Sequence, residues 1–341
     1  MKLSHLDKLS AIPALSGDEK KLAEAIVKKI DGYARWAFDS IGTLYVYKEG
    51  KKRRENPFLV MTHMDEAGLL ISGASDEGYL RFQTCGAIDP RFLLGRRVTV
   101  GSENIPGVIG CKAIHQTGAE ERKKPVGAEK LLIDIGASTK EQAEKAAAPG
   151  DSAVFMTGFE RMGGRRIRGR ALGDRIGCAV MISLIRTELP YDTVFAFTTR
   201  YHSGGSEPIA VYHTRPERTL ILGAAAADDI PGGKGECALG KGVVLPLSEQ
   251  RTVYEKNFRR QAGRCALEKE IPIQQPVLSE NSGAGRAQYA IDGVPTVFLG
   301  VPCRYLNSPA VVADEADIEN MEAIALELIS TGAEDKEENH D

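Results

Sequence analysis

Four apolar runs constrain the fold of this chain more than any other feature of its sequence. They lie at residues 57–62, 194–199, 219–222 and 297–301. Continuous apolar runs of this length are typical of parallel strands buried on both faces, because helices cover both sides of a parallel sheet. Three segments with helical periodicity accompany them, at residues 20–30, 174–185 and 314–331. Ser16 and Glu19 have the spacing of a capping box and predict the start of the first helix. The pattern predicts a sheet covered by helices on both faces, which is an α/β fold.

The pattern changes between residues 68 and 166. Short strand candidates at 97–100 and 131–134 alternate there with turns that contain glycine and proline. Such spacing is typical of a small β-rich barrel or sandwich. We therefore expect an α/β core formed by residues 1–67 and 167–341, interrupted by an inserted β domain at 68–166. A length of 341 residues is compatible with two domains.

Charge and composition exclude several classes of protein. Lys and Arg number 44 against 47 Asp and Glu, so no overall basic field attracts nucleic acid or an anionic membrane. No apolar stretch approaches the roughly 20 residues that a membrane span requires. The six cysteines include no pair at Cys-x-x-Cys spacing, which favours free thiols in a reducing compartment. We expect a cytoplasmic protein with neither nucleic acid nor membrane as a partner.

One motif whose residues suit metal binding or catalysis follows the first apolar run. His63 ends this run and Asp65 stands two residues later. Sheets of α/β proteins bind their ligands at the carboxyl ends of the strands, where this pair falls. A histidine with a nearby carboxylate suits metal ligation, since the carboxylate can orient the imidazole. On this pattern alone, a structural histidine hydrogen-bonded at a strand end is the other interpretation.

The order of motifs along the whole chain resembles that of the TET-type metallo-aminopeptidases, the family that includes glutamyl aminopeptidases and endoglucanase-like proteins. The matching segments are residues 13–19, 39–42, 62–68, 107–110, 115, 120–124, 133–137, 229–232 and 302–305. The resemblance implies a phosphorylase/hydrolase-like core with a PDZ-like β-barrel insertion that drives dimerisation. It also implies dimers that assemble into dodecamers, and two metal ions, usually zinc or cobalt, that help to remove N-terminal residues from peptides.

The resemblance also assigns the site residues, and here the chain departs from the family. His63 matches the first metal ligand, and Asp65 matches the carboxylate that orients it. The position of the bridging carboxylate falls on Gly173, and that of an aspartate ligand on the third strand falls on Gly223. A glycine has no side chain to offer a metal, so these two ligands are lost.

The remaining catalytic positions have changed as well. Tyr201 stands at the position of the general base and His202 at that of the next ligand, while Asn307 replaces the last histidine ligand. Of the five ligand positions, only His63 is unchanged. The resemblance therefore implies a degenerate member in which no cofactor is expected, with zinc or cobalt only if the site works.

Three hypotheses follow. In the first, the chain is a pseudoenzyme that binds peptide or another small ligand, or that assembles as a homo-oligomer, from dimer to dodecamer, or as a hetero-oligomer with an active paralogue. Its cleft would be lined by His63, Asp65, Asp174, His202, Arg304 and Asn307. In the second, it is an active aminopeptidase whose single metal is held by His63 and His202 with Asp174, Asp228 or Asp229. In the third, Tyr201 and His202 perform acid–base chemistry without metal.

Overall fold

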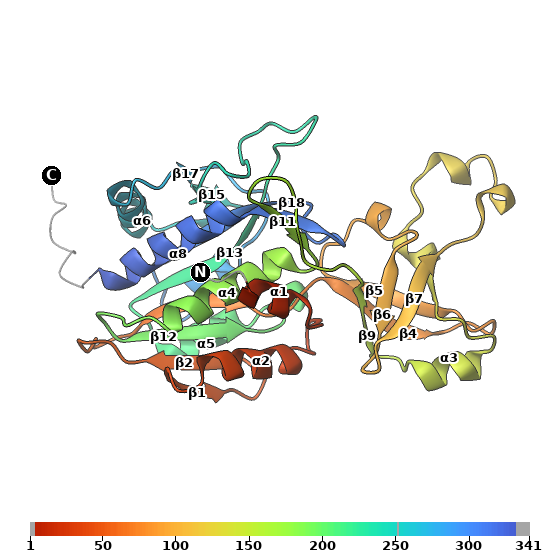
Figure 1. The fold of residues 1–341 in the computed structure, drawn as a ribbon, viewed down its shortest axis with the longest axis horizontal. Coiled ribbons are helices and arrows are strands. Elements are labelled where there is room, and N and C mark those ends of the chain that lie inside the picture. Colours follow the sequence, from red (N-terminus) through yellow and green to blue (C-terminus); the bar gives the residue numbers. More distant parts are fainter. Residues whose placement is uncertain (1–3, 251, 332–341) are drawn as a thin grey trace.

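The computed structural model describes residues 4–250 and 252–331 of the chain, and it contains a large mixed sheet beside a separate barrel (Figure 1). The large sheet has eleven strands. In spatial order the main path is β1 (Arg35–Phe38), β2 (Leu44–Lys48), β12 (Thr193–Thr198), β3 (Phe58–His63), β13 (Arg218–Ala226), β18 (Thr296–Arg304), β19 (Val311–Asp314), β11 (Arg166–Gly169) and β10 (Glu160–Arg161). Two short strands, β14 (Val243–Val244) and β17 (Ile273–Gln274), join it beside β18.

The centre of this sheet confirms the prediction from the apolar runs. Strands β12, β3, β13 and β18 are parallel neighbours, and all of them are largely buried. Side chains from alternate positions of β3 enter two different cores, so both faces of the sheet are covered. One core contains residues of α1 (Ser4–Ser10), α2 (Lys20–Ile30), α4 (Leu172–Ile185), α6 (Lys256–Glu268) and α8 (Glu315–Ser330). The other contains residues of α5 (Glu207–Thr214) and α7 (Ala284–Gln288).

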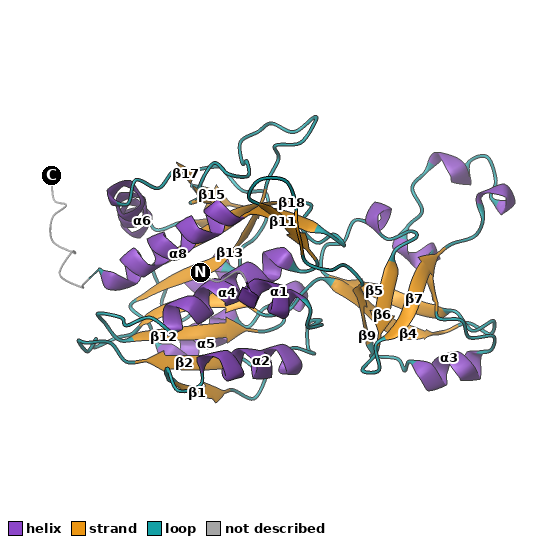
Figure 2. Ribbon diagram, in the orientation of Figure 1, coloured by secondary structure: helices purple, strands orange, loops and turns teal. Residues whose placement is uncertain are grey.

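The inserted β domain lies beside the large sheet (Figure 2) and is a closed barrel. It has a hydrophobic core of its own. Its strands, in spatial order, are β4 (Gly68–Ala74), β5 (Leu80–Cys85), β8 (Leu132–Asp134), β7 (Ile105–Gly110), β6 (Arg97–Val100) and β9 (Ser152–Phe155). Helix α3 (Lys140–Ala146) packs against β4. A long excursion, residues 111–131, connects β7 to β8 and carries the short helices η2 (Ile114–Gln116), η3 (Glu121–Lys123) and η4 (Ala128–Lys130).

The chain enters and leaves the barrel through neighbouring strands. Leu69 of β4 lies opposite Ala153 of β9. After the barrel, β10 pairs with β11, and β11 pairs with β19 of the large sheet, although β10 falls inside the expected insertion at 68–166. Among the described residues, no helix is long and apolar enough to cross a membrane.

Candidate metal site

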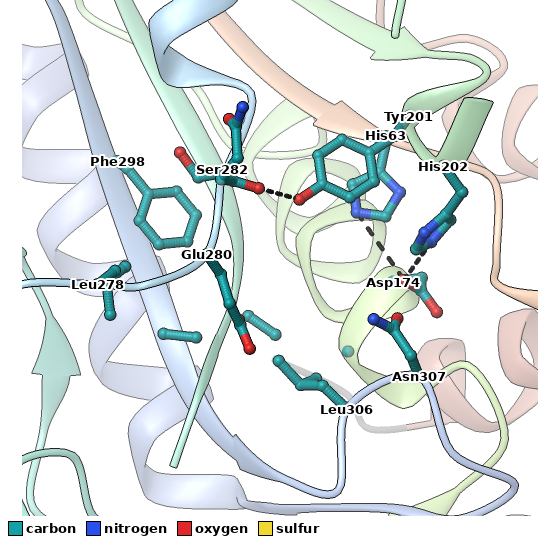
Figure 3. A pocket seen from close by; sticks show the side chains of 14 residues that line it. His63, Asp174, Tyr201, His202, Leu278, Glu280, Ser282, Phe298, Leu306 and Asn307 are labelled. Carbon is teal, nitrogen blue, oxygen red and sulfur yellow. Dashed lines mark hydrogen bonds and ion pairs between the residues drawn. The ribbon is translucent and has the colours of Figure 1, made fainter. Parts of the chain in front are cut away.

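Three elements bring a histidine, an aspartate and a second histidine together at one edge of the large sheet (Figure 3). His63 is the last residue of β3, and His202 lies in η5 (Tyr201–Ser203), the short helix that follows β12. Because β3 and β12 are parallel, with Thr198 opposite His63, both histidines lie at the same sheet edge. Asp174 reaches this edge from the first turn of α4.

The Asp174 carboxylate lies between the two imidazole rings. Its Oδ1 atom is 3.2 Å from Nε2 of His202 and 3.9 Å from Nε2 of His63. One ligand atom from each of the three residues lies within 4.8 Å of the other two. Two imidazoles and one carboxylate form a donor set that suits a divalent transition metal, zinc included. The three side chains therefore fit a single ion.

Neighbouring charges shift the pKa values of His63 and Asp174 within this cluster. Burial disfavours the charged form of His63, but the hydrogen bond and charge of Asp65 and the charge of Asp174 outweigh burial and raise its pKa. Burial likewise disfavours the ionised form of Asp174, but the hydrogen bond and charge of His202 and the charge of His63 hold its pKa below the ordinary value. Since a metal binds the neutral imidazole, protons compete with the metal for this site.

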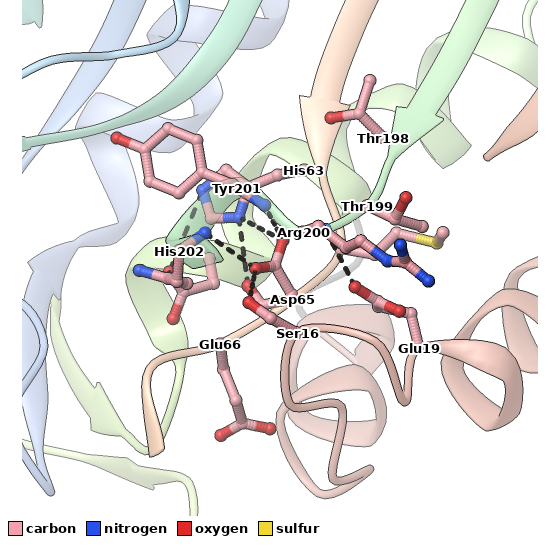
Figure 4. Close-up of polar contacts among 12 residues, drawn as sticks. Ser16, Glu19, His63, Asp65, Glu66, Thr198, Thr199, Arg200, Tyr201 and His202 are labelled. Atoms are coloured by element: carbon pink, nitrogen blue, oxygen red, sulfur yellow. Dashed lines mark hydrogen bonds and ion pairs between the residues drawn. The ribbon is translucent and has the colours of Figure 1, made fainter. Parts of the chain in front are cut away.

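Asp65 anchors the loop that follows β12 (Figure 4). Its fully buried carboxylate accepts hydrogen bonds from the backbone N–H groups of Tyr201 and His202, both at 2.9 Å, and from Ser16 Oγ at 2.5 Å. Burial opposes ionisation, but His63 and His202 keep the pKa of Asp65 well below its usual range. Nδ1 of His63 lies 3.6 Å from this carboxylate and 3.0 Å from the Asp65 carbonyl oxygen. Asp65 thus contacts His63 and also fixes the backbone of His202.

Two residues that sequence patterns assign to a helix start serve the site instead. A capping box of Ser16 and Glu19 is the expectation for α2, but this helix begins at Lys20 and no side chain caps it. Ser16 bonds Asp65, while Glu19 accepts the backbone N–H of Arg200, next to Tyr201. The capping-box prediction is wrong because Ser16 bonds the distant Asp65 instead, and Glu19 accepts the N–H groups of the distant Arg200 and of Gly17.

A buried ion cluster behind the site holds the end of β3. Glu66 accepts hydrogen bonds from Arg170 at 2.7 and 2.8 Å and from Arg175 at 2.9 Å. Arg175 is fully buried and also donates to the carbonyl oxygens of Met64 and Leu9. The sequence analysis does not predict this cluster. The only sequence signal for it is that Glu66, Arg170 and Arg175 are charged residues next to apolar segments.

Tyr201 covers the face of His63. The two rings stack at 4.1 Å between centroids with an interplanar angle of 15°, and the Tyr201 hydroxyl donates to the carbonyl oxygen of Asn281. The guanidinium of Arg286 lies 5.3 Å from the tyrosine ring and pairs with the buried Glu207 at 2.9 and 3.0 Å. Burial raises the pKa of Tyr201, so its hydroxyl remains protonated at neutral pH and is no general base there.

The cavity beside these side chains is small, with a volume of about 60 Å³. Its lining includes His63, Asp174, His202 and Asn307, together with the apolar Leu278, Phe298 and Leu306 and the carboxylate of Glu280 (Figure 3). A Cβ atom added at Gly173 would lie 2.7 Å from Leu306, and one added at Gly223 would lie 3.1 Å from the ring of Phe298. Apolar side chains therefore occupy the space beside both glycines.

Three residues of the sequence hypotheses lie elsewhere. Arg304 forms a bidentate ion pair with Asp229, with both distances at 2.7 Å, and it does not line this cavity. Asp228 accepts the backbone N–H of Cys237. Of the three carboxylates considered as a third ligand, Asp174 is the one that the described structure groups with both histidines.

The mixed α/β sheet and the inserted six-stranded barrel together match the fold of solved TET aminopeptidases. The chain matches the M42 glutamyl aminopeptidase family over residues 42–324, and it belongs to that family.

Individual relatives agree with this assignment along nearly the whole chain. The lysyl aminopeptidase of Pyrococcus furiosus is 26% identical, over 95% of this chain and 95% of its own. The TET aminopeptidase of the archaeon Thaumarchaeota archaeon SCGC AB-539-E09 superimposes with a TM-score of 0.90 at 29% identity and covers 96% of both chains. The TET1 peptidase of Pyrococcus horikoshii, which assembles into a tetrahedron or a large octahedral shell, gives 0.85 at 33% identity, over 96% of this chain and 98% of its own.

Proposed function

We propose that this M42 protein has lost dinuclear aminopeptidase chemistry and acts as a pseudoenzyme that binds a small ligand or a peptide end. The observation that carries the proposal is the filling of the former ligand positions. Leu306 and Phe298 stand beside Gly173 and Gly223, the positions that the resemblance assigns to two carboxylate ligands. Two metal ions held close together repel each other, and a bridging carboxylate offsets this repulsion. Leu306 and Phe298 are apolar and supply no such carboxylate.

The position of the general base supports the same proposal. Tyr201 holds a proton there at neutral pH and donates it to a backbone carbonyl oxygen. Loss of a general base alone typically lowers a rate by about 10²–10⁴-fold. The metal-free hydrolase hypothesis would need the same hydroxyl as an acid or a base, and its raised pKa argues against that role.

A second candidate function is favoured by one specific observation, the clustering of His63, Asp174 and His202. These residues would hold one zinc or cobalt ion, which supplies Lewis acidity and lowers the pKa of a bound water. Asn307 lines the same cavity and can orient a small ligand by hydrogen bonding. An aminopeptidase with a single metal would use this arrangement.

We also infer an oligomeric, cytoplasmic protein. The Pyrococcus horikoshii TET1 peptidase forms large shells, and the matching barrel of this chain supports a homo-oligomer between a dimer and a dodecamer, or a hetero-oligomer with an active paralogue. All six cysteines are free, as in most proteins of reducing compartments.

Metal content and peptidase activity test these functions together. Untagged protein would be incubated with zinc or cobalt, dialysed, analysed by mass spectrometry and assayed with aminoacyl-p-nitroanilides. We expect at most about one ion per chain and no turnover, since one ligand cluster remains. His202→Ala should abolish any metal binding, whereas the control His213→Ala, which removes a histidine that bonds Tyr47 away from the cluster, should not. About two ions per chain with turnover would overturn the pseudoenzyme, and one ion with turnover would establish the second candidate.

A further inference from the structure

The cavity beside the metal site has a second charged group on another of its walls. Glu280 lines this cavity, and Figure 3 shows its side chain on the side of Leu278 and Phe298, away from the two histidines. Glu280 belongs to the loop 275–283, which connects β17 to α7. All of the residues that line the cavity belong to the α/β core, so the cavity does not involve the barrel.

The loop that carries Glu280 is fixed on both sides of this residue. The backbone N–H groups of Leu278 and Ser282 both donate hydrogen bonds to residues 248–249, each at 2.9 Å. The carbonyl group that follows Glu280 in the chain accepts the hydroxyl of Tyr201. A binding group that is held in place before its ligand arrives loses little conformational entropy on binding.

The Glu280 carboxylate has no cation beside it. Among the residues that the structure describes, Glu280 forms no ion pair, and neither Lys nor Arg lines the cavity. Asp174, by contrast, lies close to both imidazoles. Glu280 as a whole is exposed, but desolvation of its carboxylate raises its pKa, while the backbone N–H of Ala226 donates to it and acts in the opposite direction. A partly desolvated carboxylate without a counter-ion favours a ligand that brings a positive charge.

The apolar wall and the volume of the cavity limit the size of such a ligand. Leu278, Phe298 and Leu306 line it, together with Ala224 and Ala225. A volume of about 60 Å³ holds roughly four to six water-sized positions, at about 10–15 Å³ for each. The group that enters the cavity therefore has about five non-hydrogen atoms, and most of them contact apolar side chains.

We propose that this cavity binds an alkylammonium group, namely a hydrocarbon chain of about four carbons that ends in a protonated amine. The ammonium would pair with Glu280, and the chain would lie against Leu278, Phe298 and Leu306. A neutral apolar ligand would leave the Glu280 charge without a partner, and an anion would be repelled by it. This inference rests on the proposed function, because it takes the cavity as the ligand site, and it adds the chemical class of the ligand.

Butylammonium is the probe, with butanol as its neutral counterpart and butyrate as its anionic one. Ligand-observed NMR titration of the full chain, freed of metal with a chelator and dialysed, measures the three dissociation constants. We expect butylammonium to bind about tenfold more tightly than butanol, to bind less tightly as salt is added, and butyrate to bind more weakly than butanol. Equal binding of butylammonium and butanol would overturn this inference and leave the ligand-binding proposal in place, whereas absence of binding by all three probes would overturn both. Metal content and turnover, measured separately, decide between the pseudoenzyme and the enzyme without these probes.

Two kinds of ligand present such a group, a lysine side chain at the end of a peptide and a free alkylamine. The tripeptide Lys-Ala-Ala, titrated in the same way, distinguishes them. Tighter binding of the peptide than of butylammonium would identify a peptide end as the ligand, and weaker binding would identify a free amine. In either case the tighter of the two ligands should lose affinity when the Glu280 charge is removed.

Variants at Glu280 complete the test. Glu280→Gln keeps the size of the side chain and should weaken butylammonium binding about tenfold, to the level of butanol, without a change for butanol. Glu280→Lys should reverse the order, so that butyrate binds more tightly than butylammonium. Glu188→Gln is the matched control with no expected effect, because Glu188 pairs with Lys51 and precedes β12, at the opposite end of this strand from the cavity. An unchanged affinity for butylammonium in Glu280→Gln would overturn the proposal, since another group would then hold the cation.

Discussion

At the scale of single residues, one buried carboxylate organises the metal site. Asp65 receives two backbone N–H groups and the Ser16 hydroxyl, and it also lies beside His63. Such a residue acts on a metal through its neighbours, because it sets the position of His202 and contacts His63. Partners of this kind typically change metal affinity by 10- to 100-fold when they are removed.

Asp65→Ala should therefore weaken zinc binding by about tenfold or more, and it should lower the free energy of unfolding by about 3 kcal/mol because two buried N–H groups lose their acceptor. Competition with a chromogenic chelator measures the first effect, and urea unfolding of the metal-free protein measures the second. Asp228→Ala is the control, since Asp228 also accepts a backbone N–H but lies outside the cluster. Equal zinc affinity in both variants would contradict the role given to Asp65.

The sequence allowed part of this site to be predicted, for a physical reason. His63 and His202 follow buried parallel strands, and the carboxyl ends of such strands meet at one edge. Ser16, Glu66 and Arg175 were out of reach, because their partners are set by packing between segments that are far apart in the chain. Local sequence patterns indicate contacts between residues that are close in the sequence, whereas the partners that give these three residues their roles are far away in it.

At the scale of elements, a buried arginine closes the end of the last long helix. Arg54 donates to the carbonyl oxygens of Ile329 and Thr331 at 3.0 and 2.7 Å, and it pairs with Glu217 at 2.5 Å. The last carbonyl groups of a helix have no partner within the helix, so this side chain supplies one. The contact links the turn before β3 to the C-terminus of α8.

Arg54→Ala should lower the free energy of unfolding by about 2–4 kcal/mol, since hydrogen bonds to a charged group contribute about 1.5–3 kcal/mol and the ion pair with Glu217 would also be lost. Hydrogen exchange should show faster opening in the last turn of α8. Arg53→Ala is the neighbouring control: the exposed Arg53 side chain pairs with Glu49 and with Asp192, and about 0–1 kcal/mol is expected for each surface pair. A similar loss in both variants would argue against a specific role for Arg54.

The first turn of α8 gives stability a dependence on pH. Asp317 accepts the backbone N–H groups of Gly240 and Gly242, and burial raises its pKa from 3.8 to about 6. Because folding favours the protonated carboxyl, the folded state binds more protons than the unfolded state between these values. The contribution of Asp317 to stability is therefore greatest at low pH, decreases as pH rises from about 4 to 6, and stays low above it.

Urea unfolding at several pH values would measure this effect in the wild-type protein and in Asp317→Asn, which cannot titrate. The stability of the wild type relative to the variant should decrease as pH rises through this window. A constant difference between the wild type and Asp317→Asn would contradict the raised pKa, because it would mean that the carboxyl has the same pKa in the folded and unfolded states.

At the scale of elements, the long buried strands could be predicted, and the short edge strands could not. Strand β3 has one apolar residue after another, whereas β1 is exposed along its length and β10 has only two residues. The pairing of β11 with β19 joins segments more than 140 residues apart, and at one end of the pairing Arg166 forms an ion pair with Asp314. No local period in the sequence encodes such a pairing.

At the scale of the whole molecule, the α/β core and the barrel have separate hydrophobic cores. The two crossings between them are adjacent, because Leu69 and Ala153 face each other at the base of the barrel. Adjacent crossings of this kind let an inserted domain fold as a unit and let its host close with a short linker. We propose that the insertion ends soon after β9, since β10 and β11 complete the large sheet.

Dissection of the chain tests this boundary. A fragment of residues 67–157 should unfold cooperatively on its own, and a chain in which a short Gly-Ser linker replaces this segment should keep the zinc affinity of the full protein. A second fragment and core pair places the C-terminal boundary of the insertion at residue 166 instead of 157. The longer fragment should gain no stability, because β10 finds its partner β11 only in the core, and the correspondingly shorter core should lose stability for the same reason. Circular dichroism melts would measure both. A longer fragment that is clearly more stable than the shorter one would return residues 157–166 to the barrel.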